Sequence, residues 1–449
     1  MGWFVHLYQK AENMGIPELK AFRGEILHFL KDPDKVGEAA SYQHFADGIL
    51  LVQDGHIREI GPAQRLLADL PAEQPVVHHR DCLIMPGFVD CHVHYPQTGM
   101  VAAYGGQLLE WLETYTFPTE GEFADGDKAR RVAEIFLDEL LRNGTTTALV
   151  LATVHPQSAE AFFQAARTRR MRMICGKVLM DRNAPKYLRD TPESGYRESK
   201  ALIRRWHGRD RLGYAVTPRF APSCSEAQLA RAAQLVNEFP GVHLHTHLAE
   251  NRDEVAWVKK LFPGCNGYLD VYDHFGLLGP RSIFAHCIQL SRAEFRRLGQ
   301  SGSGIAFCPT SNLFLGSGLF NLARSQQAAV KVGLATDIGA GTSFSLLQTM
   351  AEAYKVQQLR NHALAPFKSY YLATLGGART LGLDDSIGNF EIGKEADFVV
   401  LDYRSTPLLD LRIKGCRTLA DRLFALAMLG DDRAVKATCL LGEAAHSRE

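Results

Sequence analysis

A chain of 449 residues with 46% hydrophobic content can bury a sizeable core, whether it forms about three average domains or one elaborated barrel. Its 50 Lys and Arg residues balance its 50 Asp and Glu residues, which argues against nucleic-acid or anionic-membrane binding and favours a small substrate. The opening residues lack a secretory pattern, and no apolar run approaches the roughly 20 residues of a membrane span.

The two ends of the chain predict one small β domain. We interpret residues 1–19 as an N-terminal extension, with Met14 as a second candidate start. Two apolar runs joined by Asp54 and Gly55 predict a β-hairpin, so residues 20–82 are expected to form the first part of a β-sandwich. Residues 388–449, which contain a further apolar strand pattern, are expected to complete it and to carry a C-terminal segment.

Residues 83–387 predict an α/β barrel. Short apolar, β-branched runs alternate there with longer amphipathic segments, as in repeated βα units. Eight such runs indicate a closed (β/α)8, TIM-like barrel: 83–90, 145–154, 171–180, 213–220, 242–247, 282–287, 304–309 and 331–337. The Ser-, Gly- and Asn-rich segment 309–319 is expected to be a loop over the barrel mouth.

Histidine and aspartate side chains gather at the ends of these runs. His92 and His94 are expected just past the first strand, on one face because of their spacing of two. His247 ends the fifth run and Asp337 the eighth, at the rim where barrel enzymes place their sites. Three imidazoles and a carboxylate suit Zn2+, although Fe2+ or Mn2+ fit the same set. His245, on the same strand as His247, is expected to be structural.

A single metal ion per chain is expected. The fourth run ends without a lysine, so nothing there could become the carbamylated lysine that bridges two metals in related barrels. Lys177, in the middle of the third run, is interpreted as structural.

Glu250 follows three residues after His247 and is the predicted general acid and base. A bound metal lowers the pKa of water from 15.7 to about 7, and Glu250 would carry a proton from that water to the substrate. His286, at the end of the sixth run, is expected to orient the attacking water or to lie at the edge of the metal. Asp337 is counted both as a ligand and as a catalytic group.

The nine cysteines are scattered and odd in number, with no paired spacing that would indicate a structural zinc site or a redox motif. They are interpreted as reduced and mostly buried thiols. The absence of a secretory pattern and of a membrane-spanning run predicts a cytoplasmic protein.

These motifs resemble the amidohydrolase superfamily. The resemblance rests on the run from Pro86 to His94, on His247 with Glu250, on His286 and on Asp337. Longer blocks are similar to the guanine deaminase branch of that superfamily: 92–97, 108–112, 116–120, 217–220, 307–312 and 336–341. The similarity extends from about residue 20 to residue 440.

The resemblance implies zinc-dependent hydrolysis of guanine to xanthine and ammonia in purine catabolism, with hydroxide attacking C2. It implies that Gln97, Arg219 and Phe220 bind the substrate. Arg219 supplies a cationic donor for the oxygen at C6, Gln97 a donor and an acceptor, and Phe220 a stacking face. Trp111 and Glu110 are expected to line or support the pocket. The family also implies a homodimer.

Two other interpretations stay open from the sequence. One is a related enzyme that acts on another purine, a pyrimidine or a triazine with the same metal and the same Glu250. The other is a catalytically inactive barrel that serves as a scaffold.

Overall fold

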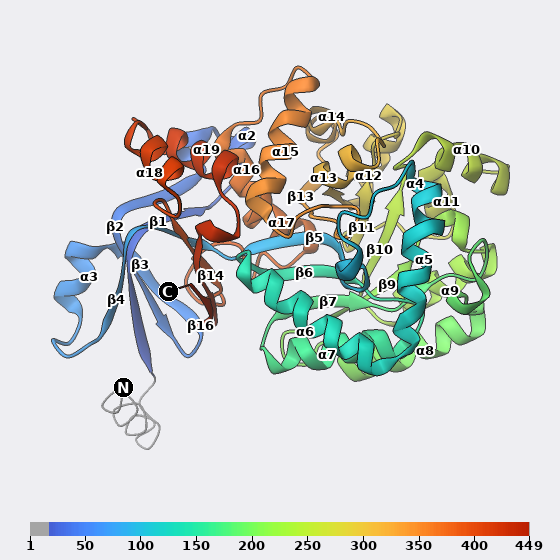
Figure 1. Ribbon diagram of the computed structural model, residues 1–449, viewed down its shortest axis with the longest axis horizontal. Coiled ribbons are helices and arrows are strands. Elements are labelled where there is room, and N and C mark those ends of the chain that lie inside the picture. Colours follow the sequence, from blue (N-terminus) through green and yellow to red (C-terminus); the bar gives the residue numbers. More distant parts are fainter. Residues whose placement is uncertain (1–17, 449) are drawn as a thin grey trace.

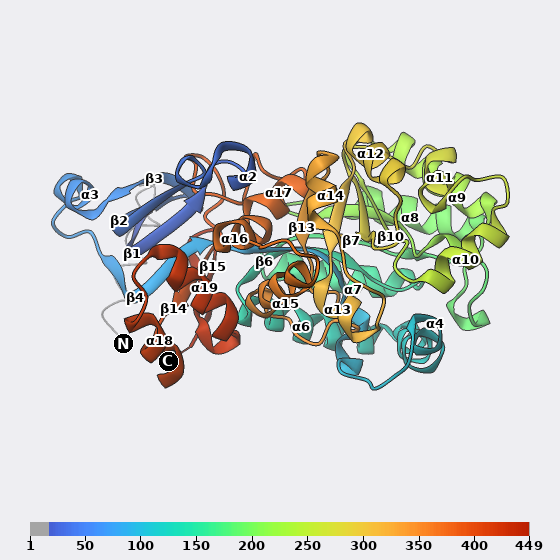
Figure 2. The same cartoon turned by 90° about the horizontal axis from the view of Figure 1, so that it is seen from above.

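Two separate sheets organise the chain in the computed structural model, which describes residues 18–448 (Figure 1). The predicted Met14 start and most of the predicted extension lie outside these residues, and the first strand already begins at Leu19. Residues 18–448 contain no helix that is both long enough and apolar enough to cross a membrane. Seen from above, the small sheet lies beside the barrel (Figure 2).

The larger sheet is the predicted barrel. Its eight parallel strands are β5 (Phe88–His94), β6 (Thr145–Leu151), β7 (Arg172–Gly176), β9 (Gly213–Pro218), β10 (His243–Leu248), β11 (Ser282–His286), β12 (Gly304–Phe307) and β13 (Lys331–Leu334), with the short β8 (Val178–Leu179) beside β9. The amide of Asp337, beyond β13, donates to the carbonyl of His92 on β5 at 3.0 Å. The amide of His94 donates to the carbonyl of Ile338 at 2.8 Å. These two hydrogen bonds join the last strand to the first, and the predicted fold class is confirmed.

An outer layer of helices surrounds the barrel, and shorter helices lie at its rim (Figure 1). The helices of the outer layer are α6 (Gly126–Arg142), α7 (Pro156–Thr168), α8 (Pro192–Trp206), α9 (Glu226–Glu238), α10 (Arg252–Leu261), α11 (Tyr268–His274), α12 (Arg292–Ser301), α14 (Leu322–Gln327), α15 (Leu346–Leu359), α16 (Pro366–Ala373) and α17 (Leu375–Leu381). Shorter helices follow the strand ends: α4 (Leu108–Trp111), α5 (Phe117–Gly121) and α13 (Pro309–Phe314).

The two chain ends build the smaller sheet together, as the sequence predicts. It is mixed, in the order β16-β15-β14-β4-β1-β2-β3. Its strands are β1 (Leu19–Phe29), β2 (Tyr42–Gln53), β3 (His56–Pro62), β4 (Val76–Pro86), β14 (Phe398–Asp402), β15 (Val435–Leu440) and β16 (Glu443–Ser447). Four helices accompany it: α2 (Pro33–Val36), α3 (Ala63–Asp69), α18 (Pro407–Lys414) and α19 (Leu419–Leu429). The predicted hairpin is β2–β3, with Asp54 and Gly55 both at positive φ in its turn.

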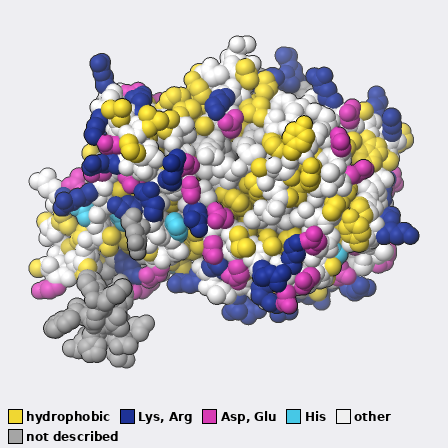
Figure 3. Space-filling view, in the orientation of Figure 1, with side chains coloured by type: hydrophobic (Ala, Val, Ile, Leu, Met, Phe, Trp, Pro, Cys, Tyr) yellow, Lys and Arg dark blue, Asp and Glu magenta, His cyan; other side chains and the backbone are white. Residues whose placement is uncertain are grey.

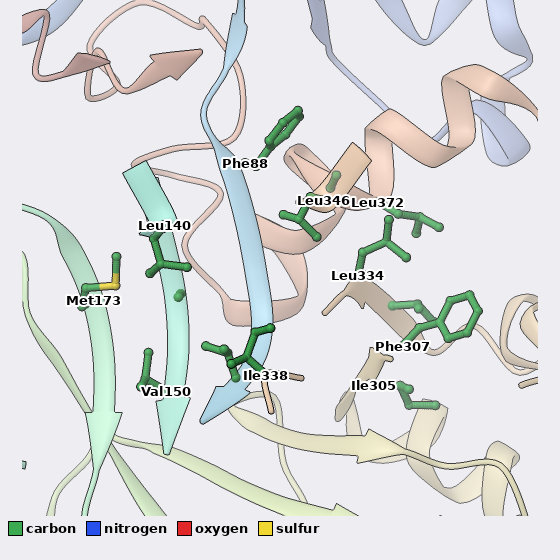
Figure 4. Close-up of a cluster of buried hydrophobic side chains, with 14 of the residues drawn as sticks. Phe88, Leu140, Val150, Met173, Ile305, Phe307, Leu334, Ile338, Leu346 and Leu372 are labelled. Atoms are coloured by element: carbon green, nitrogen blue, oxygen red, sulfur yellow. The ribbon is translucent and has the colours of Figure 1, made fainter. Parts of the chain in front are cut away.

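Alternation along the barrel strands separates two layers of core. One set of side chains packs outward against the helices, and Figure 4 shows part of it, including Phe88, Val150, Met173, Ile305, Phe307 and Leu334 from strands and Leu140, Leu346 and Leu372 from helices. The neighbouring positions, such as Val89, Leu149 and Ala306, form a second cluster of smaller side chains inside the barrel. Both faces of each strand are therefore buried, which explains the nearly continuous apolar runs.

Three local expectations are wrong. Residues 83–86 belong to β4 of the small sheet, where they pair with β14, because an apolar run does not reveal which sheet receives it. The first barrel strand begins at Phe88, so His92 and His94 lie within β5 rather than past its end. The expected loop 309–319 begins with α13, which places Pro309 in its first turn.

Charges of both signs are mixed over the surface. On the face that Figure 3 shows, Lys and Arg side chains lie among Asp and Glu side chains. Surface ion pairs such as Arg23 with Asp47 and Arg297 with Asp273 follow this pattern. The arrangement agrees with a net formal charge of zero.

Candidate active site

Four side chains from two strands and one turn meet at the C-terminal rim of the barrel. His92 and His94 come from β5, His247 from β10, and Asp337 from the turn after β13. The Nε2 atom of His94 lies 3.2 Å from the Nε2 atoms of both His92 and His247. One carboxylate oxygen of Asp337 lies 3.2 Å from Nε2 of His92 and 3.5 Å from that of His94. The structure thus brings together the four predicted ligands.

The spacing and chemistry of these atoms fit a metal ion. With bonds of about 2.0 Å, donor atoms around a tetrahedral Zn2+ lie about 3.3 Å apart, close to the distances within this cluster. Burial lowers the pKa values of His92, His94 and His247, so the rings are neutral. Nδ1 of His247 donates to the carbonyl of Arg219 at 2.7 Å, which turns the lone pair of Nε2 toward the cluster. Nδ1 of His92 lies 2.6 Å from Nε2 of His245, so His245 supports a candidate ligand from inside the barrel.

Glu250 and His286 lie beside this cluster. Nε2 of His286 is 3.4 Å from a carboxylate oxygen of Glu250 and 3.8 Å from one of Asp337. Asn312 accepts a hydrogen bond from Nδ1 of His286 at 2.9 Å, and Ser317 donates to Glu250 at 3.0 Å. Both groups are therefore oriented by residues of the segment 309–319, Asn312 within α13 and Ser317 just after it.

Their ionisation is shifted by burial and by each other's charge. Burial, reinforced by the negative charge of Asp337, raises the pKa of Glu250 to about 7 against the opposing effect of His286. Burial disfavours the charged form of His286, but the carboxylates of Glu250 and Asp337 raise its pKa. A carboxyl group whose pKa lies near neutrality can both accept and release a proton.

The backbone is strained where the strands end. Ala249, His286, Cys287 and Asp337 have φ values of 50°, 70°, 55° and 52°, a left-handed region that residues other than glycine rarely adopt. Such residues cluster at functional sites, where surrounding contacts hold them in place. The strain coincides with the rim that carries the polar side chains.

A pocket opens directly next to the cluster. Its lining residues are His94, Gln97, Leu108, Trp111, Leu112, Arg219, Phe220, His247, Glu250, Glu254, His286, Leu315, Asp337 and Ala340. All three predicted substrate residues, Gln97, Arg219 and Phe220, are therefore on its wall. The lining combines apolar side chains with polar groups, which suits a flat, polar ring.

Other sequence expectations have mixed outcomes. Trp111 lines the pocket, whereas Glu110 is exposed and does not. The ammonium group of Lys177 lies 2.7 Å from Asp190 in a buried ion pair, outside the histidine cluster. The nine cysteines are free, and seven are buried.

Sequence reasoning missed several supporting residues. Asn312 and Ser317 fall in the segment predicted as an irregular loop, so no periodicity marked them. Glu254 lines the pocket and accepts hydrogen bonds from the amides of Glu250 and Asn251 at 2.9 and 3.1 Å. A capping-box spacing from Asn251 to Glu254 was the available signal.

A family model described as the amidohydrolase family matches residues 83–445. The chain therefore belongs to the amidohydrolase family, and the resemblance inferred from its motifs is confirmed.

Particular relatives are guanine deaminases. The guanine deaminase of Escherichia coli (strain K12) is 54% identical over 431 residues, which cover 96% of this chain and 98% of that protein. The solved structure of E. coli guanine deaminase has a TM-score of 0.94 at 53% identity and covers 96% of this chain and 100% of its own. The guanine deaminase of C. acetobutylicum, solved with guanine bound in its active site, has a TM-score of 0.86 at 30% identity. The match covers 95% of this chain and 100% of that structure.

Proposed function

We propose that this chain catalyses the hydrolytic deamination of guanine to xanthine and ammonia. The observation that carries the proposal is the pocket wall, where Gln97, Arg219 and Phe220 face the same space as Glu250 and the histidine cluster. The 54% identity to a guanine deaminase, over nearly the full length of both chains, supports the same substrate.

The resident metal is proposed to be one Zn2+ per chain, held by His92, His94, His247 and Asp337. Three neutral imidazoles and one carboxylate at tetrahedral spacing support this choice over harder ions, with Fe2+ and Mn2+ as alternatives. When bound, the ion supplies Lewis-acid activation of the attacking water.

The protein's own residues then move protons and hold the ring. Glu250 takes a proton from the attacking water and returns one to the ring nitrogen next to C2, as its pKa of about 7 permits. His286 orients the water through Nε2, which makes no hydrogen bond within residues 18–448. Asp337, beside both groups, contributes charge as well as ligation.

Substrate binding is assigned to three side chains. Arg219 donates to the oxygen at C6, Gln97 contacts the polar edge of the base, and Phe220 packs against the ring face. Phe220 is itself packed edge-on against Trp257 at 6.3 Å, which limits its rotation.

The cellular setting is also part of the proposal. Nine free cysteines support a reducing compartment, and hence a cytoplasmic enzyme of purine catabolism. A homodimer is proposed from the family resemblance alone, and light scattering of the purified protein tests it.

The first experiment measures ammonia and xanthine from guanine, with adenine, cytosine and a triazine as comparison substrates. Metal-analysed protein is assayed before and after chelation. Chelator-sensitive turnover of guanine alone supports the proposal. Turnover of another ring in place of guanine would contradict the substrate assignment, and a metal-loaded protein without activity would favour the scaffold interpretation.

A further inference from the structure

Glu120 lies behind the pocket wall and contacts two of the residues that form it. It is the acidic residue of α5, 1% exposed, and it is not among the residues that line the pocket. One carboxylate oxygen accepts a hydrogen bond from Nε2 of Gln97 at 2.9 Å, and the other accepts one from Nη1 of Arg219 at 2.6 Å. A single carboxylate thus bridges both polar residues assigned to the substrate.

These contacts determine which way the Gln97 amide points. Glu120 has only acceptor atoms when ionised, so the nitrogen of the amide must face it. The amide of Gly339 donates to Oε1 of Gln97 at 3.1 Å and fixes the opposite end. The backbones of Gly339 and Gln97 approach closely at this point. A Cβ atom on Gly339 would lie only 2.8 Å from the carbonyl oxygen of Gln97, so a larger residue would not fit there. A flip of Gln97 would therefore break two hydrogen bonds at once.

The same helix also fixes the guanidinium of Arg219. The ring of Phe117, one turn before Glu120, lies 5.7 Å from the guanidinium carbon. Within residues 18–448 Glu120 accepts the one hydrogen bond that this side chain donates, which leaves its other N–H groups for a substrate. Glu120 thus holds one end of the Arg219 guanidinium, and the ring of Phe117 covers one of its faces. The carboxylate of Glu120 also balances the charge of Arg219.

We propose that Glu120 is a positioning residue that sets specificity for a purine carrying an oxygen at C6, by orienting Arg219 and Gln97 toward that edge of the base. This inference rests on the proposed function, because it names how the same pocket selects its substrate. Glu120 acts through the two side chains and does not contact the base.

The test replaces Glu120 by Gln, which keeps the shape of the side chain. The amide has only one acceptor oxygen, whereas the donors of Gln97 and Arg219 each need one. The matched control is Glu113→Gln, an exposed acidic residue seven positions earlier in the same rim segment. We expect E120Q to lose about 10- to 100-fold in kcat/KM for guanine, mainly through KM, at unchanged metal content. The inhibition constant of 2-aminopurine, which lacks an oxygen at C6, is expected to stay within about threefold of the wild-type value. E113Q should match wild type in both measurements.

Equal losses for guanine and 2-aminopurine would indicate a structural role and overturn the inference, as would wild-type kinetics in E120Q. If E120Q fails to fold, Glu120→Asp keeps the charge but withdraws the oxygens by one methylene, and must show the same guanine-specific loss. Failure of the proposed function is distinguishable, because it appears in the wild-type protein as absent guanine turnover.

Discussion

At the scale of single residues, the proposed proton transfer depends on Glu250. Glu250 is 3% exposed; its carboxylate accepts a hydrogen bond from Ser317 and lies 3.4 Å from Nε2 of His286. Other buried carboxylates near the cluster are already engaged. Asp337 faces the histidines, and Glu254 accepts hydrogen bonds from backbone amides and from Tyr268. Asp90 accepts hydrogen bonds from Thr336 and from the amide of His92.

Replacing Glu250 by Gln is therefore expected to lower kcat for guanine by about 10²- to 10⁴-fold, since an amide cannot carry the proton. Metal content and KM should change little, because the four predicted ligands are untouched. Steady-state kinetics with metal analysis measure both quantities, and Asp253→Asn, an exposed carboxylate in the same turn, is the control. A metal-loaded E250Q protein with near wild-type turnover would contradict the assignment.

The sequence indicated the residues that end barrel strands far better than those that support them. His247 and Asp337 were recognisable because strand ends converge on one rim. Glu120 falls within a block similar to guanine deaminases, but no pattern indicated its role, since it reaches the pocket from a short helix and acts through two other side chains. Such a contact depends on tertiary packing and leaves no spacing in the sequence.

At the scale of elements, the strands of the small sheet carry a buried histidine. His28 on β1 is 1% exposed; its Nε2 lies 3.0 Å from Oε1 of Gln43 on β2, and its Nδ1 accepts from the amide of Phe390. Burial lowers the pKa of His28 to about 4, against raising effects from Gln43 and Glu391. Its neutral form thus joins three segments of the small domain.

This histidine makes stability depend on pH. The folded pKa lies below the unfolded value of about 6.5, so the stabilisation is complete above pH 6.5 and is lost as the pH falls toward 4. At pH 5 the loss is expected to reach about 2 kcal/mol. Thermal melts at pH 7 and pH 5 for wild type and His28→Asn measure it: the variant is less stable at pH 7 but should lose less on acidification. Equal pH sensitivity in the two proteins would refute this role.

The sequence predicted which strands exist, but it did not predict where each of them begins and ends. All eight barrel strands were predicted because both faces of each are buried and the runs are almost continuously apolar. The same continuity hid the change of sheet between residues 83–86 and Phe88. The helix α13 was missed because its Ser and Asn residues have polar roles at the site and give no helical periodicity.

At the scale of the whole molecule, two arginines link the barrel to the C-terminal part of the small sheet. Arg172 on β7 pairs with Glu395, and Arg211 pairs with both Glu395 and Asp397. Arg211, just before β9, donates to both Glu395 and Asp397 at 2.8 Å, and Asp397 also accepts from the amide of Leu441. The side chain of Asp397 is 2% exposed. A buried carboxylate in this position needs its partner.

Arg211→Met is expected to destabilise the fold by about 3 to 5 kcal/mol, because it leaves Asp397 buried without its countercharge. The folded variant should keep kcat/KM for guanine within about twofold, since the ion pairs lie away from the pocket. Denaturant or thermal unfolding measures the loss, and the exposed Arg204→Met in α8 is the control. The double variant R211M with Asp397→Asn should recover part of the stability; without any recovery, the unpaired charge of Asp397 could not be the cause of the loss.

The proposed metal site would be a second long-range link, within the barrel, because its predicted ligands come from β5, from β10 and from the turn after β13. An ion that binds only the folded barrel stabilises it by about 2.7 kcal/mol at a concentration 100 times its Kd. Chelation should therefore lower Tm, and added Zn2+ should restore it. This measurement does not depend on enzyme activity. In Asp337→Asn the change in Tm on chelation should be smaller, because one anionic ligand is lost while the three histidines remain. An unchanged Tm after verified metal removal would mean that the ion does not join these strands, and a full shift in D337N would remove Asp337 from the ligand set while leaving the histidines in it.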